Sequence, residues 1–227
     1  MVYEYTRTEQ ILMAIITGLS NITSLPITLL CYRKHNIYVF ALAMFSMITS
    51  FLYHVCESLD IVIILKQMKW HELDNIGAIC SLNSLILVLT HYHNDIPRQN
   101  ILNYLSLFMT LIFQQRGPWE LINTFLPIII YGVFAIYDCI KHGMPKYNYQ
   151  TLWYGGFFLI AAIAMFIRGL DDLNDYLRMY HSLWHVLIGI STFYLWQIQE
   201  KTPIAMKTVL VDAFKGVLTR NNKRELI

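Results

Sequence analysis

Long apolar stretches separated by short polar connectors make up most of the chain. A helix needs about 20 mostly apolar residues to cross a bilayer, and seven stretches reach or approach that length. They predict helices over residues 10–31, 37–57, 73–92, 99–113, 119–137, 149–167 and 177–196, of which the fourth is the shortest. Turn formers such as Asn94, Gly117 and Gly143 fall in the connectors. The pattern predicts an all-α integral membrane protein built as a seven-transmembrane helix bundle.

Composition supports this class. Of the 227 residues, 56% are hydrophobic and 14% are charged, against about 25% charged in a typical soluble domain. Aromatic and apolar content rules out a disordered chain, and 10 Gly and 4 Cys rule out a collagen-like or disulfide-framework protein. We see no repeat or linker, so we expect one membrane domain over residues 1–197 and a tail over residues 198–227. The N-terminus lacks the features of a signal peptide, so we expect the first span to be retained.

The charges predict an orientation. With seven spans, 11 of the 17 basic residues lie on the face that carries the C-terminus, and 10 of the 15 acidic residues lie on the other face. Because cytoplasmic loops are enriched in Lys and Arg, we expect the N-terminus outside and the C-terminus in the cytosol.

The tail has its own pattern. Apolar residues recur at helical spacing between basic ones, including Val209, Leu210, Phe214 and Leu218. This is typical of an amphipathic basic helix that lies on the inner leaflet. The alternative is that the apolar stripe packs against the bundle or a partner subunit.

Ionisable residues inside predicted spans need a functional or structural reason, because they are costly there. His181 and His185 are four residues apart and therefore share one helical face, as two ligands of one metal require. His54 lies at the same predicted depth on another helix, as do Ser50, one turn before it, and Asp74. Three imidazoles favour zinc over calcium or magnesium. We therefore predict a zinc site of His54, His181 and His185 near the outer leaflet.

Other polar residues receive no functional role from the sequence. We see no polar stripe along any predicted span, so a transporter or receptor ranks last among the function classes. The remaining histidines fall in loops or at helix ends and are expected to be functionally silent: His35, His71, His91, His93 and His142. Buried thiols are the expected state of Cys31 and Cys139, with palmitoylation as the alternative, and a Cys56–Cys80 disulfide stays open.

The ordered set of motifs on separate helices resembles the CREST superfamily of seven-span membrane proteins. Within it, the chain is most similar to the myomaker and transmembrane protein 8 family. The matching motifs are Leu-Pro at 25–26, Tyr-His-Val-Cys at 53–56, Asp-Asn-Ile-Gly at 74–77, Arg-Gly-Pro-Trp at 116–119 and His-Ser-Leu-Trp-His at 181–185. The resemblance implies a multipass plasma-membrane protein that promotes myoblast cell–cell fusion and contains Zn²⁺. It implies membrane lipids as partners, leaves a homodimer and a fusion partner protein open, and gives no reason to expect nucleic acid.

The same resemblance leaves an enzyme as the alternative. The superfamily includes alkaline ceramidases, and here Ser50 and Asp74 complete the set expected of its lipid hydrolases. In a zinc-dependent lipid amidase or phospholipase, Asp74 would orient or deprotonate water and Ser50 would donate to the developing oxyanion. These two residues are catalytic only under that alternative.

Overall fold

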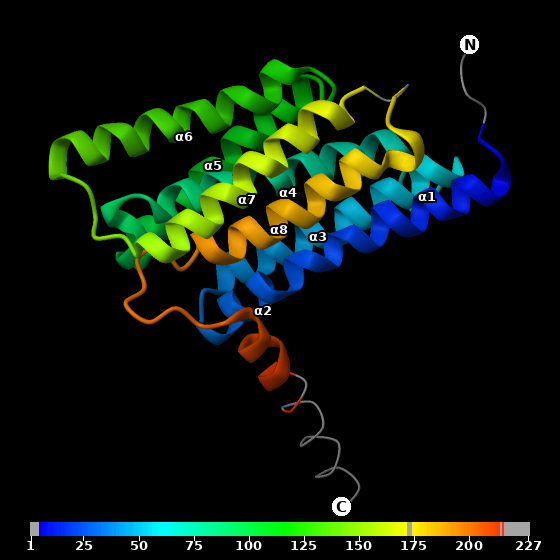
Figure 1. The fold of residues 1–227 in the computed structure, drawn as a ribbon. Helices are drawn as coiled ribbons and strands as arrows, with labels where there is room; N and C mark the ends of the chain where they lie inside the picture. Colours follow the sequence, from blue (N-terminus) through cyan, green and yellow to red (C-terminus); the bar gives the residue numbers. More distant parts are fainter. Residues whose placement is uncertain (1–4, 172–173, 214, 216–227) are drawn as a thin grey trace, which may run out of the picture.

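A computed structural model describes residues 5–171, 174–213 and 215, and their regular structure is helical (Figure 1). The α-helices and 3-10 turns follow in chain order: α1 (Arg7–Ser20), η1 (Asn21–Ser24), α2 (Leu25–Arg33), α3 (Ile37–Leu59), α4 (Gln67–Val88), η2 (His91–Asn94), α5 (Ile96–Arg116), α6 (Leu121–His142), α7 (Tyr149–Gly169), η3 (Tyr176–Arg178) and α8 (Met179–Leu195). Each of the seven predicted stretches therefore coincides with helical structure.

Among the described residues, four helical segments are long and apolar enough to cross a membrane: Arg7–Arg33, Ile37–Leu59, Leu121–His142 and Tyr149–Gly169. The first of these segments consists of α1, η1 and α2 in sequence. Pro26 lies in the first turn of α2, where the helix does not need a backbone N–H for its own hydrogen bonds. The fold is thus an all-α membrane architecture with these four candidate spans.

Several helix limits differ from the predicted ones, and two of these differences have a clear local cause. The third predicted stretch ran to residue 92, but α4 ends at Val88, and the Thr90 hydroxyl then accepts a hydrogen bond from the backbone of Tyr92 to start η2. The fourth was predicted short, but α5 extends over 21 residues because Asp95 caps its N-terminus through the Arg98 backbone. Local capping residues, which hydropathy does not register, set both limits.

The buried face of α5 is polar, which corrects the expectation that no span carries a polar stripe. Its buried residues are Gln99, Asn103, Ser106, Thr110 and Gln114, and its outward residues include the apolar Ile101, Leu105, Phe108 and Ile112. Asn83 and Ser84 of α4 donate hydrogen bonds of 2.8 Å to Ser106 and Asn103. The stripe therefore joins α5 to α4.

Helix α8 runs between α7 and α1 in the bundle (Figure 1). Gly189 permits this position, because a Cβ added there would lie 2.7 Å from Thr23 Oγ1 and 2.9 Å from the Thr23 carbonyl carbon. Thr23 in turn donates a hydrogen bond of 3.1 Å to the carbonyl of His185. Contacts between η1 and α8 thus fix the position of α8 along the axis of the bundle.

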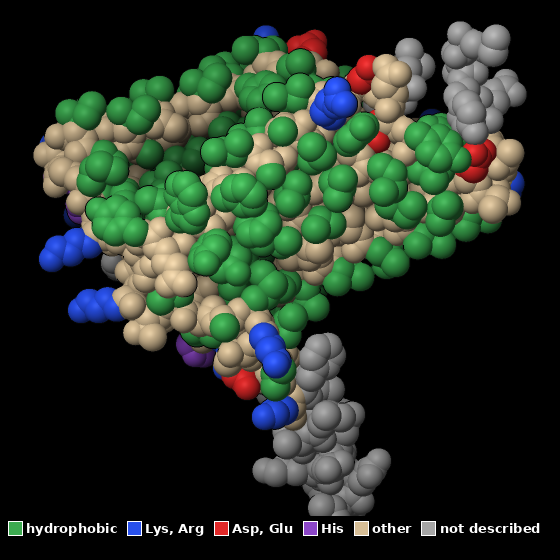
Figure 2. Space-filling model, viewed as in Figure 1, with side chains coloured by type: hydrophobic (Ala, Val, Ile, Leu, Met, Phe, Trp, Pro, Cys, Tyr) green, Lys and Arg blue, Asp and Glu red, His purple; other side chains and the backbone are tan. Residues whose placement is uncertain are grey.

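The outer surface is apolar along the bundle (Figure 2). Hydrophobic side chains cover the visible face, and the Lys and Arg side chains gather mainly toward its ends. On α6, for example, Ile129, Val133, Ile136 and Ile140 are all exposed. Such a surface suits lipid rather than water.

The first part of the tail docks on the bundle. The chain is helical over residues 206–213, and Val209 is fully buried in a core cluster with Phe193 and Ile198. Arg33 forms a 2.8 Å ion pair with Asp212. This matches the second interpretation of the apolar stripe. Inner-leaflet binding was predicted through Leu210, Phe214 and Leu218, of which Leu210 is half-buried in the docked helix and the other two lie outside the described residues.

All four cysteines have free thiols. Cys56 and Cys80 are buried within 1% exposure and form no disulfide. Cys31 is fully buried, which fits a plain packed thiol rather than a lipidated one.

Candidate metal centre

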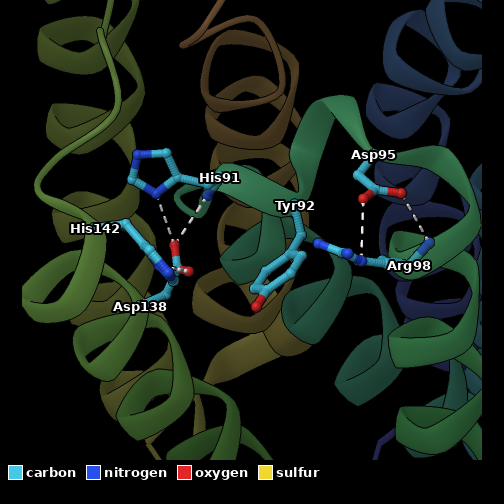
Figure 3. A pocket seen from close by; sticks show the side chains of 6 residues that line it. All are labelled: His91, Tyr92, Asp95, Arg98, Asp138 and His142. Carbon is cyan, nitrogen blue, oxygen red and sulfur yellow. Dashed lines mark hydrogen bonds and ion pairs between the residues drawn. The ribbon is translucent and has the colours of Figure 1, made fainter.

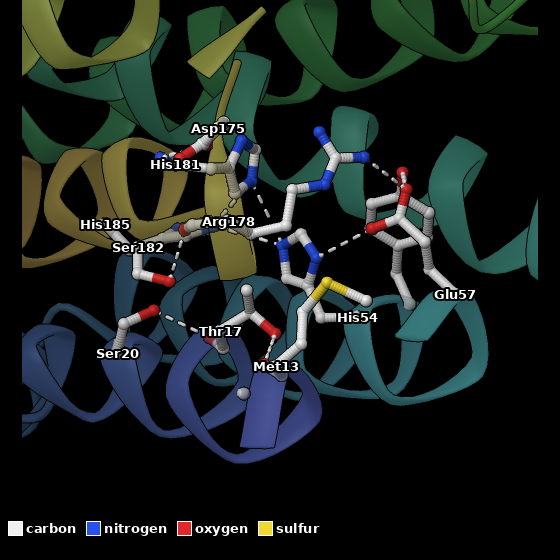
Figure 4. A network of polar contacts seen from close by, with 12 residues as sticks. Met13, Thr17, Ser20, His54, Glu57, Asp175, Arg178, His181, Ser182 and His185 are labelled. Atoms are coloured by element: carbon white, nitrogen blue, oxygen red, sulfur yellow. Dashed lines mark hydrogen bonds and ion pairs between the residues drawn. The ribbon is translucent and has the colours of Figure 1, made fainter. Parts of the chain in front are cut away.

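Three imidazoles meet at one point inside the bundle. His54 comes from α3, and His181 and His185 come from successive turns of α8 (Figure 4). The Nε2 atom of His54 lies 3.2 Å from that of His181 and 3.1 Å from that of His185, and the last two are 3.1 Å apart. The structure thus brings together the three predicted zinc ligands, with His54 itself 1% exposed.

This triangle of nitrogens fits a shared cation. A neutral imidazole Nε2 either carries a proton or offers a lone pair in the ring plane, so three such atoms cannot all hydrogen-bond to one another. Tetrahedral zinc with nitrogen ligands at about 2.0–2.1 Å separates those nitrogens by about 3.3 Å. The observed spacings are close to that value, and three histidines leave one coordination position for a further ligand.

A carboxylate supports the centre from behind. Glu57, one turn after His54 on α3, places Oε2 3.4 Å from His54 Nδ1. Its Oε1 accepts hydrogen bonds from the Tyr53 hydroxyl at 2.7 Å and from Arg178 at 2.9 Å. Because Arg178 precedes α8, the Glu57 carboxylate ties the two ligand-bearing helices together beside the three imidazoles.

A tight turn places the first ligand of α8. Leu177 and Arg178 both adopt left-handed backbone conformations, with φ of 54° and 56°, which costs a non-glycine residue about 1–3 kcal/mol. The buried Asp175 carboxylate holds this turn, because it accepts hydrogen bonds from the backbone N–H groups of Tyr180 at 2.8 Å and His181 at 3.0 Å. Strain is therefore retained where it fixes the position of His181.

Ser50 and Asp74 lie beside one another next to the histidines. Asp74 of α4 is close enough for its charge to act on His54, but it lies outside the cluster of ligand atoms formed by the three histidines. The Ser50 hydroxyl is 2% exposed and lies within hydrogen-bonding reach of the Asp74 carboxylate, although the contact does not have full hydrogen-bond geometry. All five predicted site residues are therefore neighbours, with two beside the ligand triangle rather than in it.

Residues 9–186 match the family described as "Protein of unknown function (DUF3522)". The chain belongs to this family. Over 202 residues it is 25% identical to transmembrane protein 8B of mouse, human and cattle, an alignment that covers 85% of the chain and 42% of each relative. The chain thus spans about two fifths of the length of the curated relatives it matches. These matches place it in the transmembrane protein 8 family, as the sequence motifs predicted.

The sequence indicated the three candidate ligands but missed the residues that position them. Glu57 and Asp175 were counted only as acidic residues of one face, and Arg178 only as a basic one. Each carries a weak local signal, since Glu57 follows His54 by three residues and Asp175 shortly precedes a helix. Neither signal reveals which distant group the side chain contacts.

Proposed function

We propose that the chain is a zinc-containing multipass protein of the plasma membrane with seven spans, its N-terminus outside and its C-terminus in the cytosol. The observation that supports zinc binding is the triangle of Nε2 atoms with sides of 3.1–3.2 Å. Besides the four apolar candidate spans, the topology needs α4, α5 and α8 to cross the bilayer. The polar composition of α5 is consistent with this, because α5 places its polar side chains against α4 rather than toward lipid. Helix α8 has 17 residues and an apolar composition.

For activity, the geometry best supports zinc-dependent hydrolysis of a lipid amide or ester. Bound zinc supplies Lewis acidity and makes water acidic enough to react near neutral pH. In this role Asp74 would accept a proton from the attacking water and return it to the departing amine or alcohol as the acyl bond breaks. The Ser50 hydroxyl, which lies beside Asp74, would donate to the oxygen on which negative charge develops.

The second candidate function is cell–cell membrane fusion, expected from the resemblance to myomaker. In that role the metal joins helices and Asp74 is dispensable. The specific support is that the three histidines and the Glu57–Arg178 ion pair of 2.9 Å both connect α3 to α8. Because two separate sets of contacts join α3 to α8, the centre suits a structural role as well as a catalytic one.

One set of variants tests both functions. Wild type, His181→Ala, Asp74→Asn and Ser50→Ala are expressed, and bound zinc, surface level, fatty-acid release from ceramide and phospholipid vesicles, and cell fusion are measured for each. Ser58→Ala is the control for Ser50, because Ser58 is also a buried serine on α3, 3% exposed, and has no hydrogen-bond partner among the described residues. Asp60→Asn, at the exposed end of α3, is the control for Asp74.

For a hydrolase we expect His181→Ala to lose zinc, and Asp74→Asn to keep zinc and surface level while fatty-acid release falls by about 100-fold or more. Ser50→Ala should lower fatty-acid release by a similar factor. Both control variants should release fatty acid at the wild-type rate. Fusion retained in Asp74→Asn but lost in His181→Ala, with no lipid hydrolysis by any protein, would instead support the structural role. Full zinc occupancy in His181→Ala would refute the centre itself.

A further inference from the structure

A second cluster of metal-ligating side chains lies where α6 ends (Figure 3). Asp138 and His142 occupy successive turns of α6, and His91 begins η2, just after α4. The Asp138 Oδ2 atom is 3.0 Å from Nδ1 of His91, and its Oδ1 atom is 3.0 Å from Nδ1 of His142. One ligand atom from each of the three residues falls within 4.8 Å of the others.

This cluster is remote from the three-histidine centre. Asp74, beside that centre, is near the start of α4, and His91 follows the end of α4. Val88, the last residue of α4, is 14 positions after Asp74, which corresponds to about 21 Å at the rise of an α-helix. The two clusters are therefore well separated along the bundle and share no side chain.

The carboxylate at the middle of the cluster is held in place. Asp138 is 1% exposed, and it lies in the last turns of α6, where the helix dipole disfavours negative charge. The backbone N–H of His91 donates a 3.0 Å hydrogen bond to the same Oδ2 that faces the His91 ring. A buried carboxylate in this position gains from positive charge next to it, and the two imidazoles direct their Nδ1 atoms at it.

The cluster is also open to solvent. The His91 and His142 side chains are 39% and 42% exposed, and they line a pocket of about 260 Å³ with Tyr92, Asp95 and Arg98. The Asp95 Oδ2 atom lies 3.3 Å from Nε of Arg98, so the carboxylate offsets the positive charge of Arg98. An ion can therefore reach the ligand atoms directly, and water can fill its remaining coordination positions.

We propose that His91, Asp138 and His142 form a second metal site, for one divalent transition-metal ion of the zinc class. Two imidazoles and one carboxylate suit zinc, cobalt or nickel better than calcium or magnesium, which prefer all-oxygen sites. The ion clamps the α4–α5 connector to the end of α6. Because the site is solvent-open, it exchanges metal readily, whereas the buried three-histidine centre exchanges slowly.

The test counts metal on the full-length protein in detergent after removal of bound metal with a chelator. Zn²⁺ alone is titrated into wild type, His142→Ala, His91→Gln and His181→Ala, and Co²⁺ is used in parallel because its visible absorption reports coordination. His35→Asn is the matched control. His35 is an exposed histidine outside both clusters with φ of 55°, a conformation that asparagine tolerates.

We expect two equivalents in wild type and in His35→Asn, and one in each of the other variants. The ion retained by His181→Ala should be removed by chelator faster than the ion retained by His142→Ala. Equal binding by wild type, His142→Ala and His91→Gln would overturn the second site and leave Asp138 as a hydrogen-bonded partner of two histidines. If wild type binds one equivalent, and His142→Ala loses it while His181→Ala keeps it, the result supports this site and refutes the three-histidine centre.

Discussion

At the scale of single residues, Glu57 is the carboxylate that contacts His54. Its Oε2 faces Nδ1 of His54 at 3.4 Å, which favours a proton on Nδ1 and leaves the Nε2 lone pair directed at the other two imidazoles. Carboxylates behind metal-bound histidines act in this way, by fixing the tautomer and raising ligand basicity. The hydrogen bonds from Tyr53 and Arg178 keep the carboxylate in position.

Glu57→Gln should therefore weaken zinc binding without abolishing it. Loss of this outer carboxylate is expected to lower zinc affinity by about 10–100-fold, measured by competition with a chelating dye. Glu120→Gln, at the start of α6 and outside both clusters, is the control. Wild-type affinity in Glu57→Gln would show that His54 is oriented by packing alone.

At the scale of elements, the position of α8 along its axis decides whether the metal centre can form. His185 lies one turn before Gly189, and Thr23 touches both, through a hydrogen bond to the His185 carbonyl and through contact with the glycine. A shift of α8 along its axis would separate its two histidines from His54 on α3. Close approach of η1 and α8 is thus a structural requirement of the site.

Gly189→Ala tests this contact. The added methyl group meets Thr23 backbone atoms at 2.9 Å, so we expect a loss of about 1–3 kcal/mol in stability together with weaker zinc binding. Gly156→Ala on α7 has no atom within 4 Å of the new Cβ and should be neutral or stabilising by up to about 1 kcal/mol. Thermal unfolding in detergent compares the two, and equal midpoints would contradict the argument.

At the scale of the whole molecule, the orientation of the bundle assigns each metal cluster to a side of the membrane. The end that carries the three-histidine centre faces outward if the excess of basic residues on the opposite face follows the positive-inside rule. The His91, Asp138 and His142 cluster then faces the cytosol. Orientation therefore decides which leaflet could supply a lipid to the buried centre.

Epitope tags at the two ends of the chain measure this orientation. An N-terminal tag should bind antibody on intact cells, and a C-terminal tag should bind only after permeabilisation. The reverse staining would place the three-histidine centre at the cytosolic leaflet and would redirect the search for a lipid substrate to that side.

The apolar pattern alone determined where the helices lie, because hydropathy and helical spacing are properties of neighbouring residues. It also indicated His181 and His185 as a pair, since a separation of four residues places both on one helical face. Their predicted depth in the membrane then added His54, Ser50 and Asp74, and the family motifs agreed with this set. The sequence missed the polar face of α5, because a few polar residues at helical spacing stay inconspicuous among apolar neighbours.

Only the tertiary structure decided which of these residues meet. His54 lies 127 residues before His181 in the chain, and their contact depends on how α3 and α8 pack. The same holds for Arg178 on Glu57, and for His91, which is 47 residues from Asp138. Asp138 and His142 have the four-residue spacing of the first pair, but the third ligand comes from another helix end. Such convergence results from packing between distant segments, which no local pattern encodes.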